Sequence, residues 1–210
     1  MPNLDTIIIF TTAAFVITAC PGPSMLYVMS ISLGQGRKAG IFSALGLATG
    51  LLIHTISASL GLSAVFVYSP YAYMIIKYLG ALYLICIGIR MLINGGALFY
   101  STETTPKTQS SRIYGQGILT ELLNPKTALF FLSFLPQFVD PILGPPALQM
   151  SIFGSILILT AFSVDLFIAI TGGTISQWLA RRPLVQKMQR WLAGTVLISL
   201  GMRLAFSERK

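Results

Sequence analysis

The stretch that decides the fold is TIIIFTTAAFVITACPGPSMLYVMSISLGQG, residues 6–36, whose 31 residues include no charged side chain. Two further uncharged runs follow, with 38 residues at 39–76 and 24 residues at 141–164. A helix needs about 20 predominantly apolar residues to cross the hydrocarbon core of a bilayer. These runs therefore predict an all-α membrane protein that crosses the bilayer several times.

Composition excludes an ordinary soluble globule. Of the 210 residues, 54% are hydrophobic and only 10% are charged, whereas a soluble domain usually carries about 25% charged residues. The net charge of +8 comes from short basic clusters between the apolar runs. That distribution follows the positive-inside rule and does not indicate a nucleic-acid surface. The expected partner is the lipid bilayer, and no nucleic acid.

Six transmembrane helices can be drawn through the sequence. Placing the N-terminus outside puts most Lys and Arg residues of the connections on the inner side, so the N-terminus is predicted to be periplasmic. The remaining connections are too short to hold a soluble domain, and one polytopic membrane domain is expected over 1–210. The predicted spans are 5–32, 40–68, 71–93, 114–138, 147–173 and 189–206.

The two halves of the chain resemble each other. Residues 77–80, KYLG, align with residues 190–193, RWLA, and proline interrupts both the first and the fourth span. Halves of three spans each must lie in opposite orientations, as in the inverted repeats of many secondary transporters. The predicted boundaries are a first repeat in about 1–94, a cytoplasmic loop in about 95–113 and a second repeat in about 114–210.

The prolines predict where backbone groups lose their helical partners. A proline ring removes the hydrogen bond to the carbonyl four residues earlier, so Pro21 strands the carbonyl of Ile17 and Pro125 that of Glu121. Such breaks survive in a membrane where protein or a wet cavity surrounds them, and the new helix N-termini attract carboxylates. A plain proline kink is the alternative at either break. The predicted substrate-binding residues are Pro21, Gly22, Pro23, Ser24, Asn124, Pro125 and Lys126.

Ionisable side chains inside the spans are candidates for moving protons. Asp165 lies deep in the fifth span, where a charge costs about 2.5–3.5 kcal/mol on insertion scales. It is expected to bind a proton or a substrate ammonium, with a structural ion pair as the alternative. Glu121 either takes part in proton coupling or reaches solvent near the cytoplasmic end of its span. Lys126 either pairs with Asp165 or binds a substrate carboxylate.

The only histidine, His54, is the third candidate for proton coupling. It shares a stripe with Gly46, Gly50 and Ala58, at intervals of four residues. Small residues in such a stripe usually form a contact between helices. His54 is therefore either a hydrogen-bonded packing residue or a member of a proton relay.

Other kinds of site are not supported by the sequence. There is no P-loop motif for ATP, no convincing set of metal ligands and no nucleophile–base pair for hydrolysis. We therefore expect a transporter without a cofactor or a metal, and not an enzyme.

Five segments carry a resemblance to a known family. They are CPGPS at 20–24, GQGRKAG at 34–40, YLGALYL at 78–84, LNPKTALFF at 123–131 and LPQFV at 135–139. Each is weak alone, and the combination is specific and extends over nearly the whole chain. Together they resemble the LysE/RhtB family of bacterial amino-acid exporters.

The resemblance implies six helices in the bacterial inner membrane that export amino acids or their derivatives by proton antiport. The chain is more similar to the branch for homoserine, threonine and leucine-type substrates than to the lysine branch. The implied partners are a small amino acid and protons, and a homodimer is left open. The broken-helix signatures of the family map onto Pro21, Gly22, Pro23, Asn124, Pro125 and Lys126, and its acidic residue in the fifth span onto Asp165.

Two alternatives remain beside amino-acid export. Thiol-electron carriers of the CcdA/DsbD type also have a cysteine beside a proline in the first span, as Cys20 is here. They need a partner cysteine in the fourth span, where this chain has Leu123, while Cys86 lies in the third span. That departure argues against electron transfer. The other alternative is an exporter of small molecules that are not amino acids.

Overall fold

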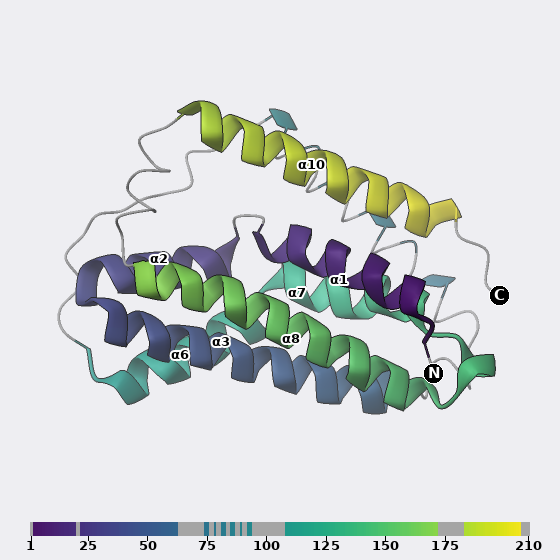
Figure 1. The fold of residues 1–210 in the computed structure, drawn as a ribbon, viewed down its shortest axis with the longest axis horizontal. Helices are drawn as coiled ribbons and strands as arrows, with labels where there is room; N and C mark the ends of the chain where they lie inside the picture. Colours follow the sequence, from purple (N-terminus) through teal and green to yellow (C-terminus); the bar gives the residue numbers. More distant parts are fainter. Residues whose placement is uncertain are drawn as a thin grey trace.

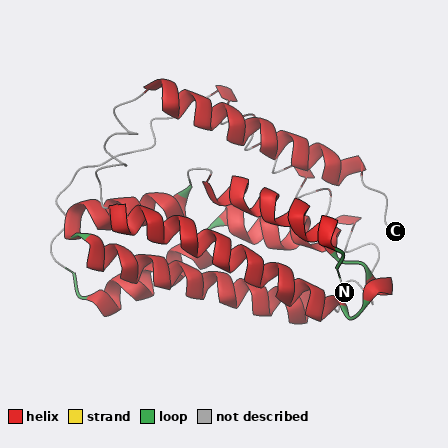
Figure 2. Cartoon of the chain, in the orientation of Figure 1, coloured by secondary structure: helices red, strands yellow, loops and turns green. Residues whose placement is uncertain are grey.

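The part of the chain that the computed structural model describes consists of helices joined by short loops and turns (Figure 2). Seven α-helices make up most of it: α1 (Leu4–Ala19), α2 (Pro23–Gln35), α3 (Arg37–Ser57), α6 (Ser110–Leu122), α7 (Pro125–Leu129), α8 (Pro146–Thr171) and α10 (Pro183–Phe206). Short π-helical turns cover Ala58–Leu62 and Phe130–Phe134, and short 3-10 turns cover Leu135–Phe138 and Pro141–Leu143. The described residues are 2–19, 22–62, 74–75, 78, 81–82, 85–86, 89, 92–93, 108–171 and 183–206.

The long helices α3, α8 and α10 run lengthwise through the molecule (Figure 1). Helix α3 packs most extensively against α6 and α8, and α1 packs against α8. Helix α10 contacts α1 and the π-helical turn that follows α7. The beginning of α1 and the end of α10 lie at the same end of the bundle, whereas α3 and α6 begin at the opposite end.

Among the residues that the structure describes, two segments are long and apolar enough to cross a bilayer without interruption, Arg37–Gly61 and Pro146–Thr171. Helices α1 and α2 pass the same test together, with a bend of 53° at their break, and so does α6 together with the segment Lys126–Phe138, with a bend of 49°. Counting each bent pair as one span gives up to four spans within the described residues. The breaks therefore lie where the prolines predict them.

The other predicted boundaries either lie outside the described residues or differ from those in the structure. Most of the predicted third span, 71–93, lies outside the described residues, and so does 95–107 of the predicted loop. Helix α6 already begins at Ser110, within the segment expected to be loop. Helix α10 begins at Pro183, earlier than the predicted residue 189, because proline is well suited to the first turn of a helix.

A glycine makes the tight reversal between α2 and α3. Gly36 has φ of 87°, a conformation that is strained for residues with a side chain. Its N–H donates to the carbonyl of Ser32 and closes α2. The reversal places the basic residues Arg37 and Lys38 at the end of the bundle where α6 also begins.

Glycines allow α3 and α6 to approach closely. A Cβ at Gly46 would overlap the backbone carbonyl of Tyr114, and one at Gly50 would lie 2.6 Å from the Cβ of Glu121. The small-residue stripe therefore forms a helix contact, as the sequence predicts. Its consequence for the site is that Glu121 is held directly against α3.

We expect Gly46→Ala to destabilise this contact, because the obstacle is backbone and cannot rotate away. Overpacking of this kind costs about 1–3 kcal/mol, measurable as a lower unfolding temperature in detergent. Gly115→Ala is the matched control on α6, since nothing lies within 4 Å of its added Cβ. It is expected to hold or raise the unfolding temperature through better helix propensity. Equal unfolding temperatures for the two variants would contradict the close contact.

Candidate functional site

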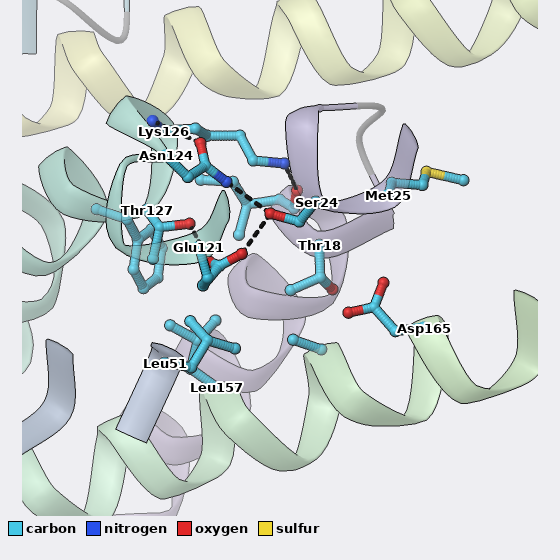
Figure 3. A pocket seen from close by; sticks show the side chains of 13 residues that line it. Thr18, Ser24, Met25, Leu51, Glu121, Asn124, Lys126, Thr127, Leu157 and Asp165 are labelled. Carbon is cyan, nitrogen blue, oxygen red and sulfur yellow. Dashed lines mark hydrogen bonds between the residues drawn. The ribbon is translucent and has the colours of Figure 1, made fainter. Parts of the chain in front are cut away.

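The two helix breaks meet in space (Figure 3). Ser24 lies in the first turn of α2, and Asn124 is the residue that precedes α7. The Asn124 side chain donates from Nδ2 to Ser24 Oγ at 2.8 Å. Two breaks that are about one hundred residues apart in sequence are thus joined by a side-chain hydrogen bond.

A buried carboxylate completes the junction. Glu121, in the last turn of α6, is only 3% exposed. Its Oε2 accepts from Ser24 Oγ, and its Oε1 accepts from Thr127 Oγ1 at 2.6 Å. The alternative in which Glu121 reaches solvent is therefore wrong, because the glycine face of α3 and the return of the chain at α7 enclose its side chain. Both carboxylate oxygens therefore have a hydroxyl group as hydrogen-bond partner.

Side chains from other helices satisfy the two carbonyls that the prolines strand. Lys126 Nζ donates to the carbonyl of Ile17 at 3.1 Å. The carbonyl of Glu121 accepts from the backbone N–H of Asn124 at 3.1 Å and from His54 Nε2 at 3.2 Å. Because a carbonyl only accepts, that imidazole nitrogen carries the proton. The first break thus takes a donor from the second half of the chain, and the second break takes one of its donors from the first half.

The two new helix N-termini differ in how they are capped. Asn124 caps α7 itself, because its Oδ1 accepts from the backbone N–H of Lys126 at 3.0 Å. No side chain caps α2 within the described residues. A Cβ at Gly22, the residue before α2, would lie 3.0 Å from Lys126 Nζ. The beginning of α2 therefore combines an uncapped helix end with a nearby ammonium group, and both favour an anion.

A cavity of about 50 Å³ lies beside this junction. Asp165, which is 8% exposed, reaches it from α8 (Figure 3). In the described part of the chain no hydrogen bond reaches the Asp165 carboxylate, and Glu121 and Lys126 line the same cavity. The cavity is lined by Ile17, Thr18, Ser24, Met25, Leu51, Glu121, Asn124, Lys126, Thr127, Phe130, Leu157, Ala161 and Asp165.

The other predicted site residues are the prolines at the two breaks and His54. Pro23 and Pro125 occupy the first positions of α2 and α7, while Pro21 lies outside the described residues. His54 does not line the cavity; its ring stacks on Phe131 with centroids 5.5 Å apart. The structure thus gives His54 a packing environment and a backbone carbonyl as partner.

We expect His54→Gln to keep export and its dependence on pH close to those of the original protein. Glutamine retains an N–H for the carbonyl of Glu121, and it does not titrate. His54→Leu removes this donor and should lower the unfolding temperature, since losing a buried hydrogen-bond partner costs about 1–3 kcal/mol. The measurement is amino-acid efflux across a range of external pH, with unfolding in detergent beside it. A changed pH profile in His54→Gln would instead favour a proton relay.

Several lining residues escaped the reasoning from sequence. Thr127 lies one turn after Asn124 within the LNPKTALFF segment, and its hydroxyl group is the feature of the sequence that could have identified it as a site residue. Leu51, Leu157 and Ala161 lie in apolar spans, where the sequence does not distinguish a residue that lines a cavity from one that only packs against other helices. Within the described residues, no group of His, Cys, Asp and Glu is placed to hold a metal ion.

Comparisons with known proteins cover nearly the whole chain. The uncharacterized membrane protein YrhP of Bacillus subtilis is 32% identical over 97% of this chain and 100% of its own length. A leucine efflux protein of an Enterobacter species is 30% identical over 93% of both chains. An uncharacterized membrane protein of Pseudomonas aeruginosa is 30% identical over 88% of both chains. No solved structure matches the chain.

The family profile of the LysE type translocators matches residues 15–208. This range includes both helix breaks, the buried Glu121 and Asp165. Together with the apolar helices, the match identifies a multi-pass membrane protein of a transporter family. The chain belongs to the LysE type translocator family.

Proposed function

We propose that this chain exports small neutral amino acids or their derivatives, of the leucine, threonine or homoserine type, across the bacterial inner membrane in exchange for protons. The observation that carries the proposal is the convergence of two helix breaks and Asp165 on one cavity. The family match and the efflux protein among the relatives support it.

The site offers complementary groups for a zwitterion. The substrate carboxylate binds at the uncapped beginning of α2 beside Lys126. The sequence predicts that the half-helix ends at both breaks bind the substrate, but in the structure Asn124 already caps α7. The carboxylate site is therefore assigned to the beginning of α2 and to Lys126.

Asp165 binds either the substrate ammonium or a proton. A carboxylate buried in a membrane protein is costly to leave charged without a partner, and its two ligands exclude each other. Proton binding from outside then releases the substrate, and loss of the proton inside prepares the site for the next substrate. Glu121, held by Ser24 and Thr127, keeps the two breaks together rather than carrying the proton.

The proposed architecture is one membrane domain over 1–210 with six spans, in which three-helix repeats at about 1–94 and 114–210 have opposite orientations. Two similar bends, 53° and 49°, in the first and fourth spans support the repeat. The N-terminus is placed in the periplasm. Asp5 lies at the end of the bundle where α1 begins, whereas Arg37, Lys38 and Arg112 lie at the other end, which the positive-inside rule makes cytoplasmic.

The test is efflux from cells that express the protein and are loaded with mixed dipeptides. We expect release of particular amino acids above an empty-vector control, and suppression of that release by a protonophore. No excess release from cells with confirmed membrane expression would contradict amino-acid export.

We expect the double variant Cys20→Ser, Cys86→Ser to export normally, because neither thiol takes part in the proposed cycle. The measurement is the same dipeptide-fed efflux, set against membrane expression. Loss of function in this variant, with its expression unchanged, would point instead to a thiol relay.

A further inference from the structure

One wall of the cavity is a single face of α8. Leu157, Ala161 and Asp165 all line the cavity, and they follow one another at intervals of four residues. Positions at this interval share one side of a helix and lie about 6 Å apart along its axis. The wall therefore has one charged position at one end and an apolar surface along the next two turns.

Other helices extend this apolar surface. Leu51 of α3 and Phe130 after α7 line the same cavity and belong to one hydrophobic cluster with Leu157 and Ala161. Figure 3 shows Leu51 and Leu157 on the far side of the cavity from Lys126 and Asn124, with Asp165 to one side. The cavity is thus divided into a polar side, at the breaks, and an apolar side.

We propose that this apolar side is the subsite for the substrate side chain, that it selects aliphatic amino acids, and that Ala161 limits the length of the side chain. The inference rests on the proposed function, because it takes the substrate ammonium to Asp165. Four bonds separate the nitrogen of leucine from its terminal methyl groups, a span of roughly 5 Å. A leucine held at Asp165 would therefore end beside Ala161, one helical turn away.

The apolar side of the cavity has no hydrogen-bonding side chain for a substrate hydroxyl. Leu51, Phe130, Leu157 and Ala161 are all hydrocarbon, and each is at most 7% exposed. An apolar pocket discriminates against an added hydroxyl by up to about 100-fold, and against a missing methylene by about 10-fold or more. Leucine and valine should therefore be exported in preference to threonine and homoserine, and leucine in preference to alanine.

The experiment measures efflux of several amino acids from the same dipeptide-loaded cells, so that ratios are independent of expression level. The panel is alanine, valine, leucine, methionine, threonine and homoserine. Ala161→Val narrows the subsite and should lower the leucine-to-alanine ratio by about 10-fold. Leu157→Ala lengthens the subsite and should raise the methionine-to-leucine ratio.

Matched controls lie on the exposed face of α8. Leu159 is 67% exposed, and Leu159→Ala removes the same atoms as Leu157→Ala without touching the cavity. Ser163 is also exposed, and Ser163→Val is the control for Ala161→Val. Both controls should leave every ratio unchanged.

Three outcomes would overturn the inference. One is a wild-type preference for threonine or homoserine over leucine. Another is that Ala161→Val and Leu157→Ala both export amino acids with the substrate ratios of the wild-type protein. If Ala161→Val does not reach the membrane, the methionine-to-leucine ratio of Leu157→Ala alone tests the inference. The third is no amino-acid export by the wild-type protein, which refutes the proposed function itself and is thereby distinguished from the first two.

Discussion

Asp165→Asn is expected to abolish proton-driven export while the protein still folds and reaches the membrane. The amide has nearly the same shape as the carboxyl group, so the packing of α8 around this 8% exposed side chain is preserved. It can neither exchange a proton nor offer a negative charge to an ammonium group. Both ligands proposed for this position are therefore lost at once.

The expected magnitude follows from removing one partner of a buried charged interaction. Such truncations cost about 2–5 kcal/mol, and 1.4 kcal/mol corresponds to a factor of ten. Export should therefore fall by about 30-fold or more. The measurement is amino-acid efflux under an imposed proton gradient, normalised to the amount of protein in the membrane.

Asp140→Asn is the matched control because it makes the same chemical change at the end of the bundle. The Asp140 side chain accepts from the backbone N–H of Ile142 at 2.9 Å, and asparagine caps such a turn equally well. This variant should export normally. If Asp165→Asn also exported normally against a concentration gradient, the coupling would have to lie elsewhere.

The positions of the helix breaks could be predicted from the sequence because proline acts locally. Pro21 and Pro125 lie four residues after Ile17 and Glu121, and that spacing alone identifies which carbonyls lose their helical partners. Both carbonyls are indeed bonded from outside the helix. The identity of the donors, Lys126 and His54, depends on how distant helices pack, and no local pattern contains that information.

The burial of Glu121 also could not be predicted from the sequence. Its position near the end of a span suggested either a coupling role or contact with solvent, because hydropathy indicates depth along a helix but not which neighbour covers a face. The structure shows that α3 covers this face: because Gly50 has no side chain, α3 can pack directly against Glu121. The stripe of small residues was recognised as packing, but its partner on α6 became known only from the structure.

Lys126→Met should reduce export of neutral amino acids by about 30-fold or more, mainly through weaker substrate binding. The proposed carboxylate site loses its only cationic side chain among the cavity-lining residues, and Lys126 is half-buried. Truncating one partner of a charge pair that the bound substrate buries costs about 2 kcal/mol or more. The measurement is efflux from proteoliposomes preloaded with leucine at increasing concentrations. Lys187→Met, at an exposed position of α10, is the control and should behave like the wild-type protein.

Lys126 also donates to the carbonyl of Ile17, so its removal lowers stability by about 1–3 kcal/mol as well. Leucinamide separates the two effects, because it keeps the ammonium group and the side chain of leucine but has no carboxylate. General damage to the fold would lower efflux of leucine and of leucinamide by the same factor. Loss of a carboxylate partner should lower the efflux of leucine but not that of leucinamide. The wild-type preference for leucine over leucinamide should then nearly vanish in Lys126→Met. Equal losses for both would assign Lys126 to the helix break rather than to the substrate.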